Sequence, residues 1–127
     1  MLTFDCTTPR GAQGAGKRAL EVRSSKPKSQ RGRTSVGIAR ARDLANGKAM
    51  SPETVRRMLN YFTRHEVDKQ GSTWSDQGKG WQAWHGWGGD AGFSWSRKVV
   101  RQMDSVDNKA QSLRAYGEAL QLSEAPR

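Results

Sequence analysis

Few side chains in this sequence are suited to catalysis or metal binding. Its two histidines are His65, which precedes Glu66, and His85, which lies five residues before Asp90. A metal site needs at least a third ligand in a recognisable frame, and the single cysteine, Cys6, has no companion at a metal-ligand spacing. No serine or pair of carboxylates stands in a context typical of nucleophilic or acid–base catalysis. We therefore expect no enzymatic activity, no metal and no cofactor, and we expect His65 to interact with the last carbonyls of a helix.

Residues 11–18, GAQGAGKR, have most of the pattern of a nucleotide-binding loop. They fit G-x-x-x-x-G-K-[ST] except at the last position, where Arg18 replaces the hydroxyl that binds Mg²⁺. Such a loop also needs a parallel α/β sheet around it, and the chain has no hydrophobic strands to build one. We therefore interpret the segment as a flexible basic linker.

Positive charge dominates the composition. Lysine and arginine number 22 against 12 acidic residues, which gives a formal net charge of +10. This excess favours polyanionic partners, either nucleic acid or an acidic protein surface. No apolar run approaches the roughly 20 residues that span a bilayer, so we expect no membrane partner. The lone cysteine favours a reducing compartment.

The first 34 residues carry much of this charge. They hold eight basic residues against two acidic ones, with many glycines and few apolar side chains. This composition buries too little apolar surface to offset the entropy of ordering the chain. We therefore predict an extended arm over residues 1–34. It would contact nucleic acid or neighbouring subunits through its basic residues: Arg10, Lys17, Arg18, Arg23, Lys26, Lys28, Arg31 and Arg33.

Two helices are predicted after the arm. The first runs from a cap at Thr34 or Ser35 to a left-handed stop at Gly47. The second has Ser51 as N-cap and Pro52 in the first helical position. Its apolar stripe at i, i+3, i+4 and i+7 predicts the core residues Val55, Met58, Leu59 and Phe62. The basic residues that flank the stripes are either a solvated face or part of the binding surface: Arg40, Arg42, Arg56, Arg57 and Arg64.

Four of the five tryptophans lie within residues 80–95. Trp81, Trp84 and Trp87 recur every three residues, so they share one side of a helical turn. Gly88–Gly89 would end that turn, and Asp90 would cap a further helix. The pattern predicts two short helices that meet at a glycine hinge.

Two roles are open for these tryptophans. Trp81, Trp84 and Trp95 are expected to close a core that has few aliphatic side chains. The alternative is a surface platform on which nucleic-acid bases stack. Trp74, which is alone in a polar loop, and Trp87 are the candidates for exposure at an interface.

A short apolar stripe marks the C-terminal end, with spacings of four, three, four and three residues: Val106, Ala110, Leu113, Gly117 and Leu120. It is too short to be stable alone, so we expect it to dock on the domain or on a neighbouring subunit. The chain is thus predicted to be an all-α mini-domain of about four short helices over residues 35–105. The basic arm precedes this domain, and a docking helix over residues 106–127 follows it.

Three stretches in this order resemble a small tryptophan-containing module of tailed-bacteriophage proteins, including those of cyanophages. They are TSVGIARARDLANG, SPETVRRMLNYFTRHEVDKQG and GWQAWHGWGGDAGFSW, and they lie within residues 33–103. The resemblance implies a phage setting, often near head and structural genes, and implies no activity. The chain departs from the module at His85 and Gly86, where a bulky apolar residue is expected. The positions that match are Arg40, Arg42, Arg64, His65, Trp84, Trp87, Gly88, Gly89, Asp90 and Trp95.

Charge, composition and resemblance together favour a non-enzymatic structural component of a phage particle. It would be a cement, neck or internal head protein in a multi-copy assembly, located in the virion and in contact with other virion proteins. Its basic arm would lie across neighbouring subunits or packaged nucleic acid. The alternative is a phage-encoded, sequence-tolerant DNA- or RNA-binding protein that acts in the host cell.

Overall fold

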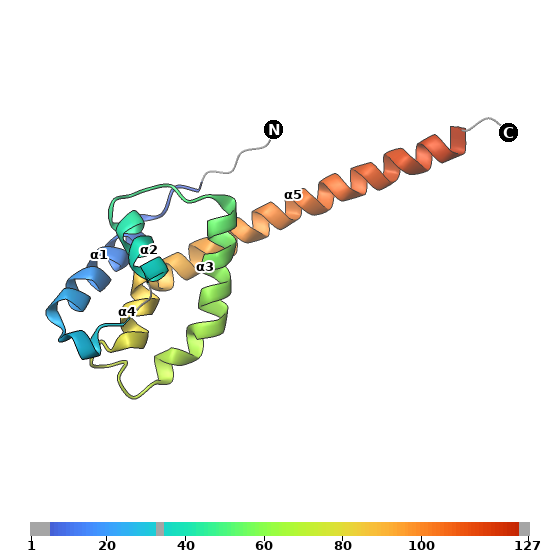
Figure 1. The fold of residues 1–127 in the computed structure, drawn as a ribbon. Helices are drawn as coiled ribbons and strands as arrows, with labels where there is room; N and C mark the ends of the chain where they lie inside the picture. Colours follow the sequence, from blue (N-terminus) through green and yellow to red (C-terminus); the bar gives the residue numbers. More distant parts are fainter. Residues whose placement is uncertain (1–5, 33–34, 125–127) are drawn as a thin grey trace.

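The chain folds into a helical domain from which one long helix projects (Figure 1). The structure, a computed structural model, describes residues 6–32 and 35–124 and contains no strand in these ranges. The all-α prediction is therefore confirmed. The elements are α1 (Arg10–Ser25), η1 (Lys28–Gln30), α2 (Ser35–Ala45), α3 (Pro52–His65), η2 (Glu66–Gln70), α4 (Lys79–Gly86) and α5 (Gly89–Glu124), where η marks a 3₁₀ helix.

Helix α1 lies where we expected an extended arm, and that prediction is wrong for residues 10–25. The helix packs against α2 and α4, with Ala12, Gly16 and Ala19 buried along one side. A Cβ on Gly16 would lie 2.9 Å from the Cβ of Leu44, so the glycine allows the two helix backbones to approach closely. Composition did not indicate this packing because small side chains bury little area of their own.

The GAQGAGKR segment forms the first turns of α1, so its interpretation as a flexible linker is also wrong. Its glycines serve helix packing. A Cβ on Gly11 would lie 2.9 Å from the Cβ of Ala91 in α5. The segment is therefore continuous helix rather than a loop around a phosphate. Arg33 and Thr34, the end of the predicted arm, lie outside the described residues.

Helix α3 begins as the sequence predicts. The side chain of Ser51 accepts a hydrogen bond from the backbone nitrogen of Thr54 at 3.2 Å, and Pro52 occupies the first turn. The preceding helix α2 is followed by Gly47 in the left-handed region, with φ of +70°. The apolar stripe of α3 faces the core, where Val55, Met58 and Phe62 are fully buried and Leu59 is partly buried.

The centre of the core is an aromatic cluster around Trp84, which is 1% exposed. Its ring meets Phe62 edge-on at 4.9 Å and Phe93 edge-on at 5.7 Å between centroids. The indole nitrogen donates to Asp90 Oδ1 at 2.9 Å, and Lys69 Nζ donates to the same oxygen at 2.7 Å. Asp90, which we expected to cap a helix, therefore joins η2, α4 and the first turn of α5.

The other tryptophans surround this cluster to different depths. Trp81 is buried, and Trp95 is partly buried against the core. Trp74 folds its loop back, with its ring 6.3 Å from the ring of Trp84 in an edge-on contact. Trp74 and Trp87, the two interface candidates, are both half-buried and packed against the core.

Gln82 of α4 is a fully buried polar residue that the sequence did not single out. Its amide nitrogen donates to the carbonyls of Gln30 and Gln77, each at 3.0 Å. Its amide oxygen accepts from the backbone nitrogen of Gly32 at 3.0 Å. These bonds use both amide hydrogens and one lone pair of the oxygen, so Gln82 fastens the η1 segment and the 71–78 turn to α4.

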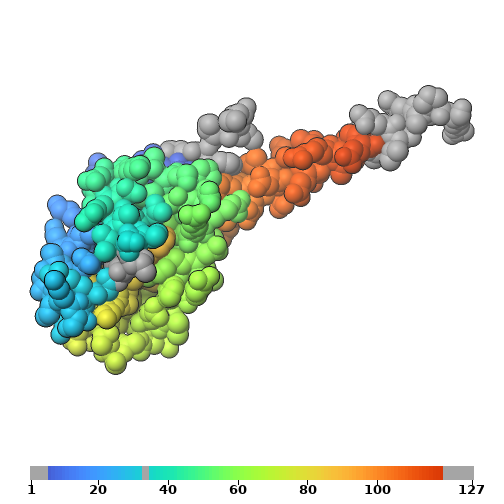
Figure 2. Space-filling model, in the orientation of Figure 1, coloured from blue at the N-terminus to red at the C-terminus, as the bar shows by residue number. Residues whose placement is uncertain are grey.

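Helix α5 is continuous from Gly89, so a separate helix that starts near residue 106 is a wrong prediction. Among the side chains of α5 that the structure describes, Met103 is the last buried one, and residues 104–118 are exposed or half-buried. This stretch contacts the domain through the ion pairs of Arg56 with Asp104 at 2.9 Å and with Asp107 at 3.6 Å. The helix then leaves the domain (Figures 1 and 2). Over residues 106–117 the stripe therefore does not dock on the domain, and the side chain of Leu120 lies outside the described part of the chain.

Candidate nucleic-acid interface

Three aromatic rings stack in a row beside α3, with an arginine against one of them. The ring of Tyr61 lies 4.8 Å from that of Trp87, with 14° between the planes, and 4.7 Å from that of His65, with 26° between the planes. The guanidinium carbon of Arg40 lies 5.7 Å from the centroid of Trp87. Tyr61 is therefore stacked against two neighbouring rings. The row therefore joins side chains from α2, α3 and the end of α4.

Local sequence explains how the three rings are presented to one another. Tyr61 and His65 are four residues apart on α3, so they lie on the same side of the helix. Trp87 directly follows α4 and precedes Gly88 and Gly89, whose φ values of +122° and +64° turn the chain into α5.

A groove of about 300 Å³ runs along this row. Arg57, Asn60 and Arg64 are exposed, whereas Tyr61, His65 and Trp87 are half-buried. The groove therefore presents two arginine heads and an amide beside the stacked rings. We call this surface the α3 groove; it is lined by Arg57, Asn60, Tyr61, Arg64, His65 and Trp87.

Arg40 lies against Trp87, which lines the groove, and does not line the groove itself. It pairs with Asp43 at 3.6 Å and donates from the same nitrogen to Met50 Sδ at 3.6 Å. Its Nε is buried without a hydrogen-bond partner among the described residues. Burial lowers the pKa of Arg40, Asp43 opposes this, and the positive charge of Arg57 lowers the pKa further. Arg40 and Arg57 therefore contribute positive charge to the same region.

The cations of the groove are held loosely. Arg57 pairs with Glu53 at 2.8 Å, but both side chains are mostly exposed, so the pair is worth about 0–1 kcal/mol. His65 Nδ1 lies 3.1 Å from Asp68 Oδ2 rather than against the last carbonyls of α3, which corrects our expectation for this residue. An incoming phosphate would therefore compete with weak contacts.

Many other basic residues predicted to bind partners instead hold the fold together. Arg23 donates to the carbonyl of Gly32 at 3.3 Å, and Arg31 donates to the carbonyls of Lys26 and Ser24 at 2.8 and 3.3 Å. Arg23 and Arg31 fix chain segments through these bonds, so they are not freely available to a polyanion. Arg56 pairs with Asp104 and Asp107 of α5, but these contacts are exposed and therefore weak.

The remaining basic candidates lie on the surface. Arg10, Lys17 and Arg18 are exposed on α1, and the guanidinium of Arg18 lies 5.8 Å from the Trp81 ring centroid. Lys28 and Arg42 are exposed too. These residues come from a packed helix, from η1 and from α2, whereas the α3 groove gathers cations around one hollow.

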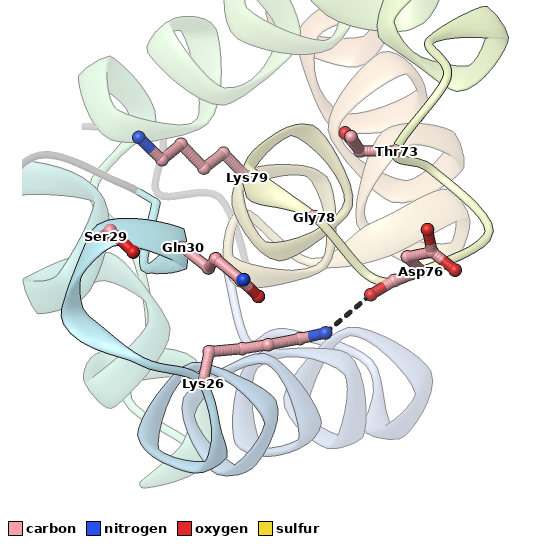
Figure 3. Close-up of a pocket in the computed structure, with 7 residues that line it drawn as sticks. All are labelled: Lys26, Ser29, Gln30, Thr73, Asp76, Gly78 and Lys79. Atoms are coloured by element: carbon pink, nitrogen blue, oxygen red, sulfur yellow. Dashed lines mark hydrogen bonds between the residues drawn. The ribbon is translucent and has the colours of Figure 1, made fainter.

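A second hollow, of about 380 Å³, lies between η1 and the start of α4 (Figure 3). Lys26 crosses it and donates from Nζ to the backbone carbonyl of Asp76 at 2.7 Å. The amine of Lys79 points away from that of Lys26 (Figure 3). Because one lysine is bound to the protein and the other points elsewhere, this hollow is a weaker anion site than the α3 groove.

The pKa values of His85 and Asp90 are both lowered, for different reasons. His85 stacks on Trp81 at 4.0 Å, and its Nδ1 lies 3.0 Å from the carbonyl of Trp81. Burial lowers the pKa of His85, and the carbonyl contact opposes this. The hydrogen bond from Lys69 lowers the pKa of Asp90 most strongly, and the bond from Trp84 adds to it. These groups serve the core, and neither lines the α3 groove.

Among the described residues, no group of three or more histidine, cysteine, aspartate or glutamate side chains is arranged to hold a metal ion. Within the same ranges, no helix has the length and apolar character needed to cross a membrane. Comparison with protein-family models, curated proteins and solved structures finds no match to this chain.

The sequence pointed to only part of this surface. Arg40, Arg57, Arg64 and Trp87 were candidates, while Asn60 and Tyr61 were missed. The missed signal was present, because Arg57, Asn60, Tyr61 and Arg64 stand at i, i+3, i+4 and i+7. This spacing places them on one side of α3, opposite the apolar stripe.

Proposed function

We propose that the chain is a non-enzymatic protein that binds nucleic acid through its phosphates, with tolerance for sequence. The observation that carries this proposal is the α3 groove, in which Arg57 and Arg64 stand beside Asn60 on an otherwise aromatic surface. Arginine heads bind phosphate oxygens in a bidentate way, and amide nitrogens add a further donor. The net charge of +10 adds long-range attraction.

We expect tolerance for nucleic-acid sequence because the groove offers few groups that would read individual bases. Tyr61 is already stacked against Trp87 and His65, so these rings are engaged with one another rather than standing free for bases. Exposed arginines on a single helix contact the backbone more readily than they fix one base edge. Fluorescence anisotropy with two duplexes of unrelated sequence tests this proposal. Affinities within about threefold of each other, which fall steeply with salt, are expected. No binding at low salt, or a preference of several orders of magnitude, would contradict it.

A second candidate is a structural component of a phage particle, in which the groove contacts packaged nucleic acid and α5 contacts other virion proteins. The observation that favours it is the stretch of α5 beyond Met103, which projects from the domain (Figure 2). Mass spectrometry of purified particles tests this role. A stoichiometric amount of the protein supports it, and its absence from particles places the binding activity in the host cell.

A further inference from the structure

Helix α5 carries an apolar stripe beyond the point where the domain covers it. Val99 and Met103 are buried in the core, and Val106, Ala110, Leu113 and Gly117 continue the stripe with spacings of three, four, three and four residues. Leu113 is 62% exposed in the projecting part. A lone helix of this kind is only marginally stable in water. The stripe therefore needs a partner surface.

We propose that this surface pairs with the same stretch of a second copy of the chain, and that the two helices run antiparallel. The stripe places Ala110 and Gly117 at a positions and Val106 and Leu113 at d positions of a heptad. In an antiparallel pair each a position lies opposite a d position. Ala110 then meets the partner's Leu113, and Gly117 meets the partner's Val106, so every layer joins a small residue to a larger one.

A parallel pair would pack these residues poorly. Its layers join like positions, so Ala110 and Gly117 would each face their own counterpart and leave voids. Leu113 would face the partner's Leu113 between these two thin layers. In the antiparallel pair every layer has a similar total side-chain volume, so the two helices can stay at a constant distance. Packing therefore favours the antiparallel arrangement.

The charges beside the stripe favour the same orientation. Asp107 and Arg114 occupy e positions, and Lys109 and Tyr116 occupy g positions. Antiparallel helices bring e positions together, so Asp107 faces the partner's Arg114, and symmetry repeats the pair. They also bring Lys109 against the ring of the partner's Tyr116, whose side chain is 65% exposed here. A parallel pair would instead place Lys109 against the partner's Arg114, which is repulsive.

The contact is short, and this sets its strength. Residues 106–117 extend over about 18 Å of helix, which is far less than a long coiled coil. We therefore expect a dimer that dissociates in about the micromolar range. The 3.6 Å contact between Asp107 and Arg56 is exposed and therefore weak. The Asp107 side chain can exchange this contact for one with the partner. This inference does not depend on nucleic-acid binding.

Sedimentation velocity over a range of concentrations measures the dimer dissociation constant of the full chain and of its charge-swapped variants, and so tests the inference. Asp107→Arg and Arg114→Asp should each raise the dimer dissociation constant about tenfold, because two attractive contacts become repulsive. The double variant should restore the dimer to within about threefold of the parent. Gln111→Asp with Ser112→Asp is the control, because it changes the charge by the same amount as Arg114→Asp on the opposite face.

Three outcomes would overturn the proposal. The first is a parent chain that stays monomeric up to about millimolar concentration. The second is a stronger dimer in Arg114→Asp alone, which is the behaviour of a parallel pair because Lys109 would then face an aspartate. The third is an equal effect of the control pair, which would show that net charge rather than the stripe governs association.

Discussion

The ring of Trp87 lies almost parallel to that of Tyr61, with 4.8 Å between centroids and 14° between planes. This contact joins the end of α4 to the polar side of α3 and sets one wall of the α3 groove. It also occupies a tryptophan that would otherwise be free to stack on a base. We therefore propose that the arginines beside this stack, rather than its rings, would contact phosphate.

The packing of α1 predicts opposite effects for two glycines in the same helix. Gly16→Ala should cost about 1–3 kcal/mol, because its Cβ would lie 2.9 Å from the Cβ of Leu44 and 3.0 Å from the carbonyl oxygen of Ala41. Gly14→Ala has nothing within 4 Å of the new Cβ and should stabilise by about 0.5–1 kcal/mol. Thermal or urea unfolding measures both. Equal, near-zero effects would instead indicate a flexible arm.

The buried amide of Gln82 predicts a loss of stability without a change of volume. Gln82→Met keeps the size of the side chain and removes three hydrogen bonds, so it should cost about 2–4 kcal/mol. Denaturant unfolding measures the loss. Gln111→Met, on the exposed part of α5, is the control and should change stability by less than about 0.5 kcal/mol. A neutral Gln82→Met variant would mean that η1 and the 71–78 turn do not depend on this amide.

Burial of His85 predicts that stability falls at mildly acidic pH. The folded state lowers the pKa of His85 below its ordinary value of 6.5, so the unfolded chain binds the proton more readily. Stability should therefore be unaffected by this group above pH 6.5 and should decline as pH falls through the lowered pKa. Denaturant midpoints measured between pH 4 and pH 8 reveal the decline. In His85→Gln this part of the decline should disappear, and an unchanged profile would contradict the assignment.

The sequence predicted those features that depend on neighbours along the chain. Ser51 and Pro52 start α3, and Gly88–Gly89 turns the chain before α5, because caps and left-handed glycines act locally. Packing of Gly16 on Leu44 was not predictable in this way, since it requires knowing which helices meet. Gln82 was missed for the same reason, because two of its three backbone partners, Gln30 and Gly32, are about 50 residues away in the sequence.

The candidate site likewise combines features that local sequence predicts with contacts between distant residues that it does not predict. The cations of α3 were visible in the sequence, and their spacing with Asn60 and Tyr61 could have shown that they share one side of the helix. The stack of Trp87 on Tyr61 joins residues 26 positions apart, and no periodicity reports such a contact. Composition also suggested Arg23 and Arg31 as binding residues, but both donate hydrogen bonds to backbone carbonyls within the fold.

The most direct test of the central claim is the salt dependence of nucleic-acid binding in matched charge variants. Arg57→Gln with Arg64→Gln removes two cations of the α3 groove, and Lys98→Gln with Arg101→Gln removes two exposed cations of α5 outside it. Each is compared with the parent chain on one labelled duplex by plotting log affinity against log salt. The groove pair should flatten the slope by about 1.8, and the control pair should change it by less than about 0.5. An unchanged slope in the groove pair, or equal changes in both pairs, would contradict the account.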